Sequence, residues 1–225
     1  MKAMHLSKSS FASGLQCVKL LWLGKHRRDL KTEPDDATKA IFSDGTQVGN
    51  LAKELYPGGV EIVAEYYEYG KALALTQIAA GTDAPALYEA AASFDDIFVR
   101  ADILKRNANG HWDLIEVKRS TREKAEHLPD VAIQVYVLDR SGFTIDNAYL
   151  MLVDNASADR NPKDPKPRFK LIDMTAKAKD YEPKLPEFIT KFKGVLAGAE
   201  PKIAVGGQCD SPYQCPFKEY CGEMK

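Results

Sequence analysis

Apolar side chains recur every three to four positions in several segments, which is the period of an amphipathic helix. The first such segment follows a run of serines suited to N-capping, ends near Gly24 and contains Cys17. In the second, Gly45 and Gly49 weaken the helical pattern. The expected helices cover residues 7–24, 35–55, 71–80, 122–140 and 186–196.

The middle of the chain instead contains short apolar runs separated by Asp95-Asp96 and by Asn107-Ala108-Asn109-Gly110. Acidic turns and Asn-Gly pairs are typical of hairpins, so three successive antiparallel strands are predicted here. Two further strands are expected, with a charged, proline-rich loop over 154–167 between them. The expected strands cover residues 87–94, 97–106, 111–118, 148–153 and 168–172. This pattern predicts an α/β fold, with a mixed central sheet flanked by helices.

Composition limits the classes of protein that fit. The chain has 225 residues, of which 44% are hydrophobic and 28% charged, so a globular domain with a sizeable core is expected. Lys and Arg total 31 against 32 for Asp and Glu, which argues against a protein that coats polyanions. No apolar run approaches the roughly 20 residues of a membrane span, and the start does not resemble a secretory signal. We therefore expect a cytoplasmic protein without a membrane partner.

Two neighbouring strands carry the candidate chemistry. Asp102 lies inside an apolar run, and Glu116 and Lys118 share one face of the next strand because side chains alternate. If the strands form a hairpin, Asp102 comes beside Glu116, and paired carboxylates suit a hard cation such as Mg²⁺. The ion could activate a water on a phosphodiester while Lys118 orients the nucleophile or stabilises charge. An ordinary exposed sheet face is the alternative, and the apolar neighbours of both carboxylates argue against it.

Asp102 followed by Glu116-Val117-Lys118 resembles the D…(D/E)-x-K signature of the PD-(D/E)XK nuclease superfamily. Gln134 in the next predicted helix is similar to the Gln of the RecB-type branch. The resemblance implies a restriction-endonuclease-like fold and Mg²⁺ or Mn²⁺ bound by Asp102, Glu116 and the Val117 carbonyl. It makes Lys118 the catalytic base or its positioner, and it places Gln134 against the metal site or the substrate phosphate. A polar residue capping a core helix is the alternative for Gln134.

Two further residues match this resemblance only in part. Tyr136 follows Gln134 after one residue, whereas the branch has Gln-x-x-x-Tyr, so no role is carried over to it. Glu89 lies on the strand before Asp102, where related nucleases often add a His or Glu to the metal. An edge-strand surface carboxylate is the alternative for Glu89.

The four cysteines are unevenly placed: Cys17 stands near the start, and Cys209, Cys215 and Cys221 lie within the last 17 residues. This arrangement resembles the iron–sulfur subgroup of RecB-type nucleases, which includes AddB-type nuclease domains and CRISPR-associated adaptation nucleases. The resemblance implies a [4Fe–4S] cluster that ties the two ends together, shielded by aromatic and proline neighbours such as Tyr213. Four thiolates also suit Zn²⁺, although paired C-x2-4-C knuckles are lacking.

Together these features predict one nuclease domain over residues 1–225: a helical part over 1–85, the catalytic sheet and helix over 86–175, and the cysteine-rich tail over 176–225. The expected function is metal-dependent cleavage of DNA, as an exonuclease on single-stranded or end-containing substrates. The alternatives are a non-catalytic nucleic-acid-binding or scaffold module, and a CRISPR spacer-processing nuclease that needs partners. Candidate DNA contacts are the basic residues 25–28 and 119–124 and the aromatic residues 66–69.

Overall fold

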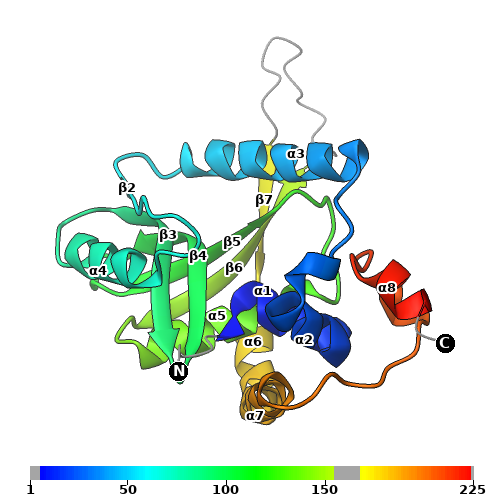
Figure 1. Ribbon diagram of the computed structural model, residues 1–225. Coiled ribbons are helices and arrows are strands. Elements are labelled where there is room, and N and C mark those ends of the chain that lie inside the picture. Colours follow the sequence, from blue (N-terminus) through cyan, green and yellow to red (C-terminus); the bar gives the residue numbers. More distant parts are fainter. Residues whose placement is uncertain (1–5, 155–167, 224–225) are drawn as a thin grey trace.

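The computed structural model describes residues 6–154 and 168–223, apart from the side chains of residues 37–39 and 41–43. Its centre is a seven-stranded mixed sheet (Figure 1). Six strands follow the order β2-β3-β4-β5-β6-β7, and β1 pairs with β4. The strands are β1 (Leu6–Ser7), β2 (Val60–Glu61), β3 (Ala86–Phe94), β4 (Ile97–Arg106), β5 (Trp112–Lys118), β6 (Ile145–Asp154) and β7 (Arg168–Asp173).

Hairpins and crossovers both build this sheet. The pairs β3–β4, β4–β5 and β6–β7 are antiparallel, as the turn signals predict, whereas β5 and β6 are parallel and joined by a helical crossover. Asp95, Asp96 and Gly110 have positive φ at the two hairpin turns. The predicted strands are confirmed, and the mixed α/β class is therefore correct.

The helices lie on both sides of the sheet. The longer ones are α1 (Lys8–Gln16), α2 (Val18–His26), α3 (Asp36–Lys53), α4 (Tyr69–Ala80), α5 (His127–Arg140) and α7 (Leu185–Ala197). The shorter ones are η1 (Arg28–Leu30), α6 (Thr175–Tyr181), η2 (Glu182–Lys184), η3 (Gly207–Cys209) and α8 (Lys218–Glu223). Among the helices of the described chain, none is both long and apolar enough to cross a membrane.

Side chains that alternate along the strands pack into two apolar cores, one on each face of the sheet. Leu104, Leu114 and Leu150 point into the larger core, with α1, α5 and α7. Their neighbours Ile103, Ile115 and Met151 point to the other face, into a smaller core that includes Ala52 of α3. Helix α3 thus lies across the face of the sheet opposite α5 (Figure 1).

The expected first helix is wrong in one respect: it is two helices. Cys17 adopts an extended conformation (φ −163°, ψ 122°) between α1 and α2, so the chain turns there. Cys17 therefore lies at a helix junction, which frees its side chain from the helical repeat. Gly45 and Gly49 do not interrupt α3. Helix α5 begins at His127, later than predicted, and β1, β2 and α6 were not predicted. Most of the predicted 154–167 loop lies outside the described residues.

Candidate active site

Asp102 and Glu116 face each other where two strands part. The ladder between β4 and β5 runs from Arg106–Trp112 to Ile103–Ile115, and the same register places Asp102 opposite Glu116. Beyond this point β5 continues beside β6, and the amide of Val117 donates to Oδ2 of Asp102 at 2.7 Å. The Asp102 side chain thus satisfies a backbone N–H that the ladder leaves free. The fork therefore brings the two carboxylates together, as the sequence predicts.

Three donors from three elements converge on Glu116, whose side chain is 1% exposed. Lys118, two residues after Glu116 in β5, donates to Oε1 of Glu116 at 2.7 Å. Gln134 of α5 donates to Oε2 at 2.9 Å. Lys8, the first residue of α1, contacts both oxygens at 3.0 and 3.1 Å. Asp130, one helical turn before Gln134, also accepts a hydrogen bond from Lys118.

The electrostatics separate the two carboxylates. Burial and the nearby Glu116 raise the pKa of Asp102 from 3.8 to about 7, against the opposing effect of Lys8 and Lys118. Burial alone would raise the pKa of Glu116. The charges of Lys118 and Lys8 outweigh burial and hold the pKa of this carboxyl below its usual range. The carboxylates in turn outweigh burial at Lys118, so its pKa lies well above its usual value. Glu116 and both lysines are therefore charged at neutral pH, whereas Asp102 is poised to gain or lose a proton.

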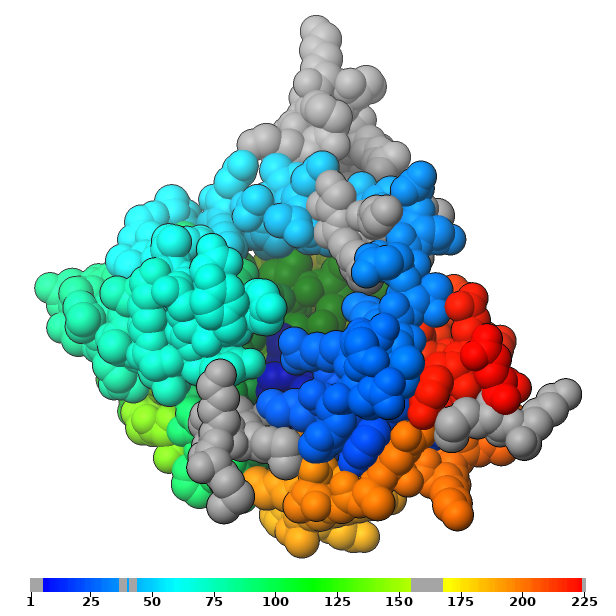
Figure 2. Space-filling model, viewed as in Figure 1, coloured from blue at the N-terminus to red at the C-terminus, as the bar shows by residue number. Residues whose placement is uncertain are grey.

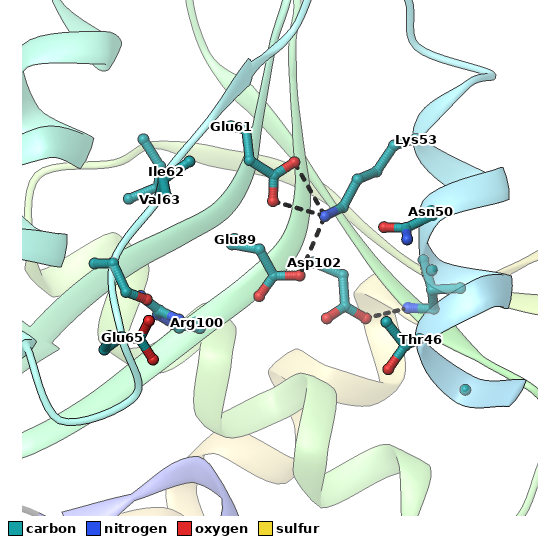
Figure 3. A pocket seen from close by; sticks show the side chains of 14 residues that line it. Thr46, Asn50, Lys53, Glu61, Ile62, Val63, Glu65, Glu89, Arg100 and Asp102 are labelled. Atoms are coloured by element: carbon teal, nitrogen blue, oxygen red, sulfur yellow. Dashed lines mark hydrogen bonds and ion pairs between the residues drawn. The ribbon is translucent and has the colours of Figure 1, made fainter. Parts of the chain in front are cut away.

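Glu89 lies across from Asp102 on the other neighbouring strand. The pairs Tyr88–Ile103 and Ala90–Ala101 flank it, and its own φ is +57°, an unusual value for a residue with a side chain. Figure 3 shows its carboxylate in the same pocket as Asp102, with Lys53 of α3 between Glu89 and Glu61. Lys53 contacts these carboxylates at 3.5 and 2.8 Å, respectively. Glu89 is thus close to the site but ion-paired.

The donor set fits a hard divalent cation in chemistry. Carboxylate and carbonyl oxygens are its preferred ligands, and the neighbouring residues Asp102, Glu116 and Val117 carry such oxygens. The buried Oε1 of Gln134 has no hydrogen-bond partner among the described residues, so the site retains an unused acceptor beside Glu116. Within the same residues, no three His, Cys, Asp or Glu side chains are already arranged to hold a metal ion. The lysines hold Glu116 in the geometry described.

The four cysteines line one small cavity together with aliphatic residues of α2 and the tail. Burial raises the pKa of the Cys215 thiol, and the other three cysteines act in the same direction, so all four are electrostatic neighbours. Thiols from both ends of the chain therefore lie around one cavity. Such a set of donors is suited to a metal bound by thiolates. They do not form a closed ligand cage in the part of the chain that the structure describes.

Several residues lie elsewhere than the sequence suggests. Tyr136 is buried against Phe94 and beneath Arg140, so it belongs to the packing of α5. Tyr213 does not shield the cysteines: it is 55% exposed and lines a groove with Lys118.

The predicted DNA contacts of residues 25–28 and 66–69 mostly contact their own neighbours. Arg27 pairs with Asp29, and His26 stacks on Trp22. Tyr66 and Tyr67 are exposed and contact each other edge to face, whereas Tyr69 packs on Phe98.

Sequence analysis missed Lys8 and Asp130. The spacing of Asp130 four residues before Gln134 places both on one helix face and could have identified Asp130. Lys8 has no such local signal, because it lies 108 residues from Glu116 along the chain.

Comparison with known proteins gives limited similarity. No protein-family model matches the chain, and no curated protein matches it. Among solved structures, it is similar to SSO0001, with a TM-score of 0.44 and 14% identity over 96% of this chain and 85% of that one. It is also similar to an alkaline exonuclease (LHK-Exo) from Laribacter hongkongensis, with a TM-score of 0.48 and 14% identity over 86% of this chain and 90% of that one. At this degree of similarity, the function has to be argued from the residues of the chain itself.

Proposed function

We propose that this protein is a metal-dependent deoxyribonuclease with a restriction-endonuclease-like fold, acting as an exonuclease on single-stranded or end-containing DNA in repair, recombination or defence. The observation that carries the proposal is the strand fork at Asp102 and Glu116, where the lysine and glutamine of the sequence signature both bond to Glu116. Surface ion pairs contribute little to stability and are common on exposed sheet faces, whereas here the central Glu116 is 1% exposed and Gln134 is fully buried, and the neighbouring Asp102 lines a pocket.

Each residue of the cluster has a chemical role in this proposal. Asp102, Glu116 and the Val117 carbonyl would hold Mg²⁺ or Mn²⁺, with Glu89 as an additional carboxylate. The bound ion supplies Lewis-acid polarisation of the phosphodiester and activation of a water. Asp102 is partly protonated at neutral pH, so binding the ion requires it to lose that proton.

Lys118 acts as a cation in this scheme. Its raised pKa keeps the ammonium protonated at neutral pH, so it orients the nucleophile and offsets developing charge. Gln134 fixes the orientation of Glu116 through its amide. Lys8 brings a second ammonium to the same carboxylate and is a second candidate to neutralise the scissile phosphate.

We also propose that Cys17, Cys209, Cys215 and Cys221 ligate a [4Fe–4S] cluster that joins the N-terminal helices to the tail. The convergence of all four thiols on one cavity supports this assignment. Iron thiolates colour a protein, whereas Zn²⁺ is d¹⁰ and has no such absorbance. Protein purified without oxygen should therefore be brown with about four irons per chain. One equivalent of zinc in a colourless protein would exclude the cluster and leave the nuclease assignment intact.

The decisive experiment is a cleavage assay on end-labelled single- and double-stranded DNA with Mg²⁺ or Mn²⁺. Wild-type protein should release short products only with metal, and Glu116→Gln and Lys118→Ala should be inactive. Lys71→Ala, a surface lysine paired with Glu68, is the matched control and should cleave normally. DNA binding without any cleavage would favour the non-catalytic module. Cleavage that appears only with partner proteins would favour the CRISPR spacer-processing role.

A further inference from the structure

Helix α3 separates two cavities that differ in charge. Gly45, Thr46, Gly49, Asn50 and Lys53 line the first cavity. Asp44, Gln47, Val48 and Leu51 line the second. At 100° per residue these two sets lie on opposite faces of the helix. Figure 2 shows a hollow beneath α3, bounded by α3 and the N-terminal helices, with residues from the middle of the chain on its floor.

The two cavities meet the candidate active site from opposite sides. The first, of about 550 Å³, includes Asp102 and Val117 in its lining. The second, of about 830 Å³, includes the neighbouring Lys118. Because Val117 and Lys118 are consecutive in β5, the strand fork lies at the boundary between the two cavities.

The charges of the two linings are opposed. Four carboxylates and two cations line the first cavity, namely Glu61, Glu65, Glu89, Asp102, Lys53 and Arg100. Four cations and one carboxylate line the second, namely Lys118, Arg119, Arg122, Lys124 and Asp44. Its His127 is buried, and burial together with Lys118 lowers the pKa of this imidazole, so it adds no charge at neutral pH. We call the second cavity the basic groove.

The cations of the basic groove differ in how firmly they are already paired. Arg119 is bound to Asp44 of α3, and Lys124 lies 3.8 Å from Glu126. Arg122 is exposed and forms no ion pair with any other described residue. All three lie in the β5–α5 connection that follows Lys118, and they line the same cavity as Lys118.

Tyr213 lines the basic groove together with residues of α3. The residue is 55% exposed, and no other aromatic ring of the described chain packs against it. Its backbone is nevertheless fixed, because Nε2 of Gln16 donates to the Tyr213 carbonyl at 2.7 Å and to the Gln208 carbonyl at 2.8 Å. An exposed aromatic ring on a fixed backbone beside a row of cations suits stacking on an unpaired base.

We propose that the basic groove binds the backbone of single-stranded DNA, with Arg122 and Lys124 on its phosphates and Tyr213 stacked on one of its bases. This inference rests on the proposed nuclease function and names the path by which its substrate reaches Lys118. The carboxylates of the first cavity repel a phosphate backbone, so the strand lies on the basic side and only its end passes the fork.

The test is equilibrium binding of a fluorescent oligothymidine in EDTA, where no cleavage occurs, measured by anisotropy at several salt concentrations. Arg122→Ala combined with Lys124→Ala should weaken binding and reduce the slope of log affinity against log salt by about 1.4, the value for two phosphate contacts. Tyr213→Ala should weaken binding about fivefold or more, whereas Tyr213→Phe should bind as the wild type does. Lys71→Ala combined with Lys193→Ala is the matched control for lost surface charge and should leave the slope unchanged.

Three outcomes would overturn the groove assignment. They are an unchanged salt slope in the Arg122/Lys124 variant, equal losses for Tyr213→Ala and Tyr213→Phe, and binding of a blunt duplex as tight as that of the single strand. Thermal unfolding of each variant checks that the fold is retained. If groove variants lose binding while the wild type never cleaves DNA, the groove stands and the nuclease proposal fails. If the wild type cleaves and the groove variants bind normally, only the groove assignment fails.

Discussion

Replacing Asp102 by Asn should stabilise the metal-free protein at neutral and alkaline pH. Asn is nearly isosteric and retains an oxygen to accept the Val117 amide. It removes, however, a charge that the folded state tolerates poorly, because burial and Glu116 raise the pKa of Asp102 to about 7. Residues that are costly to bury but required for chemistry are a common source of such gains.

The size of the effect follows from the pKa difference. The pKa of Asp102 rises from 3.8 to about 7, and each pKa unit corresponds to 1.36 kcal/mol. The largest possible gain in unfolding free energy is therefore about 4 kcal/mol. Asp102 is only partly buried and water screens part of this cost, so we expect about 1–3 kcal/mol.

The sign depends on pH. A raised carboxyl pKa means that the folded state holds the proton more tightly than the unfolded chain does. The wild type therefore loses this contribution as pH rises from about 4 through about 7, whereas the amide of the Asp102→Asn variant does not titrate. The advantage of Asp102→Asn should be near zero at about pH 4, grow across this window and level off above about pH 8.

Urea unfolding with EDTA at pH 5, 7 and 9 measures this difference. Adding Mg²⁺ should cancel or reverse this advantage of about 1–3 kcal/mol, because an ion at 100 times its Kd stabilises the wild type by about 2.7 kcal/mol and the variant much less. Asp113→Asn is the control: this carboxylate is also buried, but it accepts from Asn107 and Asn147 outside the pocket, so its loss should destabilise the protein without altering the Mg²⁺ response. A difference between Asp102→Asn and wild type that does not change with pH would refute the electrostatic argument.

Three further predictions concern the helices around the site. Lys8→Met should lower the cleavage rate at least tenfold in a single-turnover assay while Mg²⁺ still stabilises the protein, because an ammonium supplies no ligand atom; an unchanged rate would exclude a role for Lys8. Gly14→Ala should destabilise the protein by about 1–3 kcal/mol in urea unfolding, because its Cβ would lie 2.8 Å from the ring of Phe192. Gly24→Ala, where no atom lies within 4 Å, should instead be neutral or stabilising, and equal effects of the two changes would contradict this packing argument. Cys17→Ser should remove the visible absorbance and make the tail sensitive to limited proteolysis; retained iron in this variant would mean that Cys17 is not a ligand.

Local periodicity along the chain was enough to predict the part of the site built from neighbouring elements. Side chains alternate in a strand, so Glu116 and Lys118 had to share a face, and the Asn-Gly turn set the hairpin that brings Asp102 opposite Glu116. Gln134 was predicted instead from its resemblance to the glutamine of the RecB-type branch, and it does bond to Glu116 from the following helix. In neighbouring strands joined by a short turn, the distance between two residues along the chain determines whether they lie side by side in the sheet.

Which distant residues join this site was evident only once the chain had folded. Lys8 reaches Glu116 because β1 pairs with β4 and starts α1 beside the fork, a pairing that two residues of strand could not signal. Cys17 lies at a break between helices that the helical pattern did not reveal, and Tyr213 was assigned to the cysteines although it lines the groove beside Lys118. Contacts of this kind depend on how whole elements pack, and packing follows from the sum of many apolar contacts with no local sequence signature.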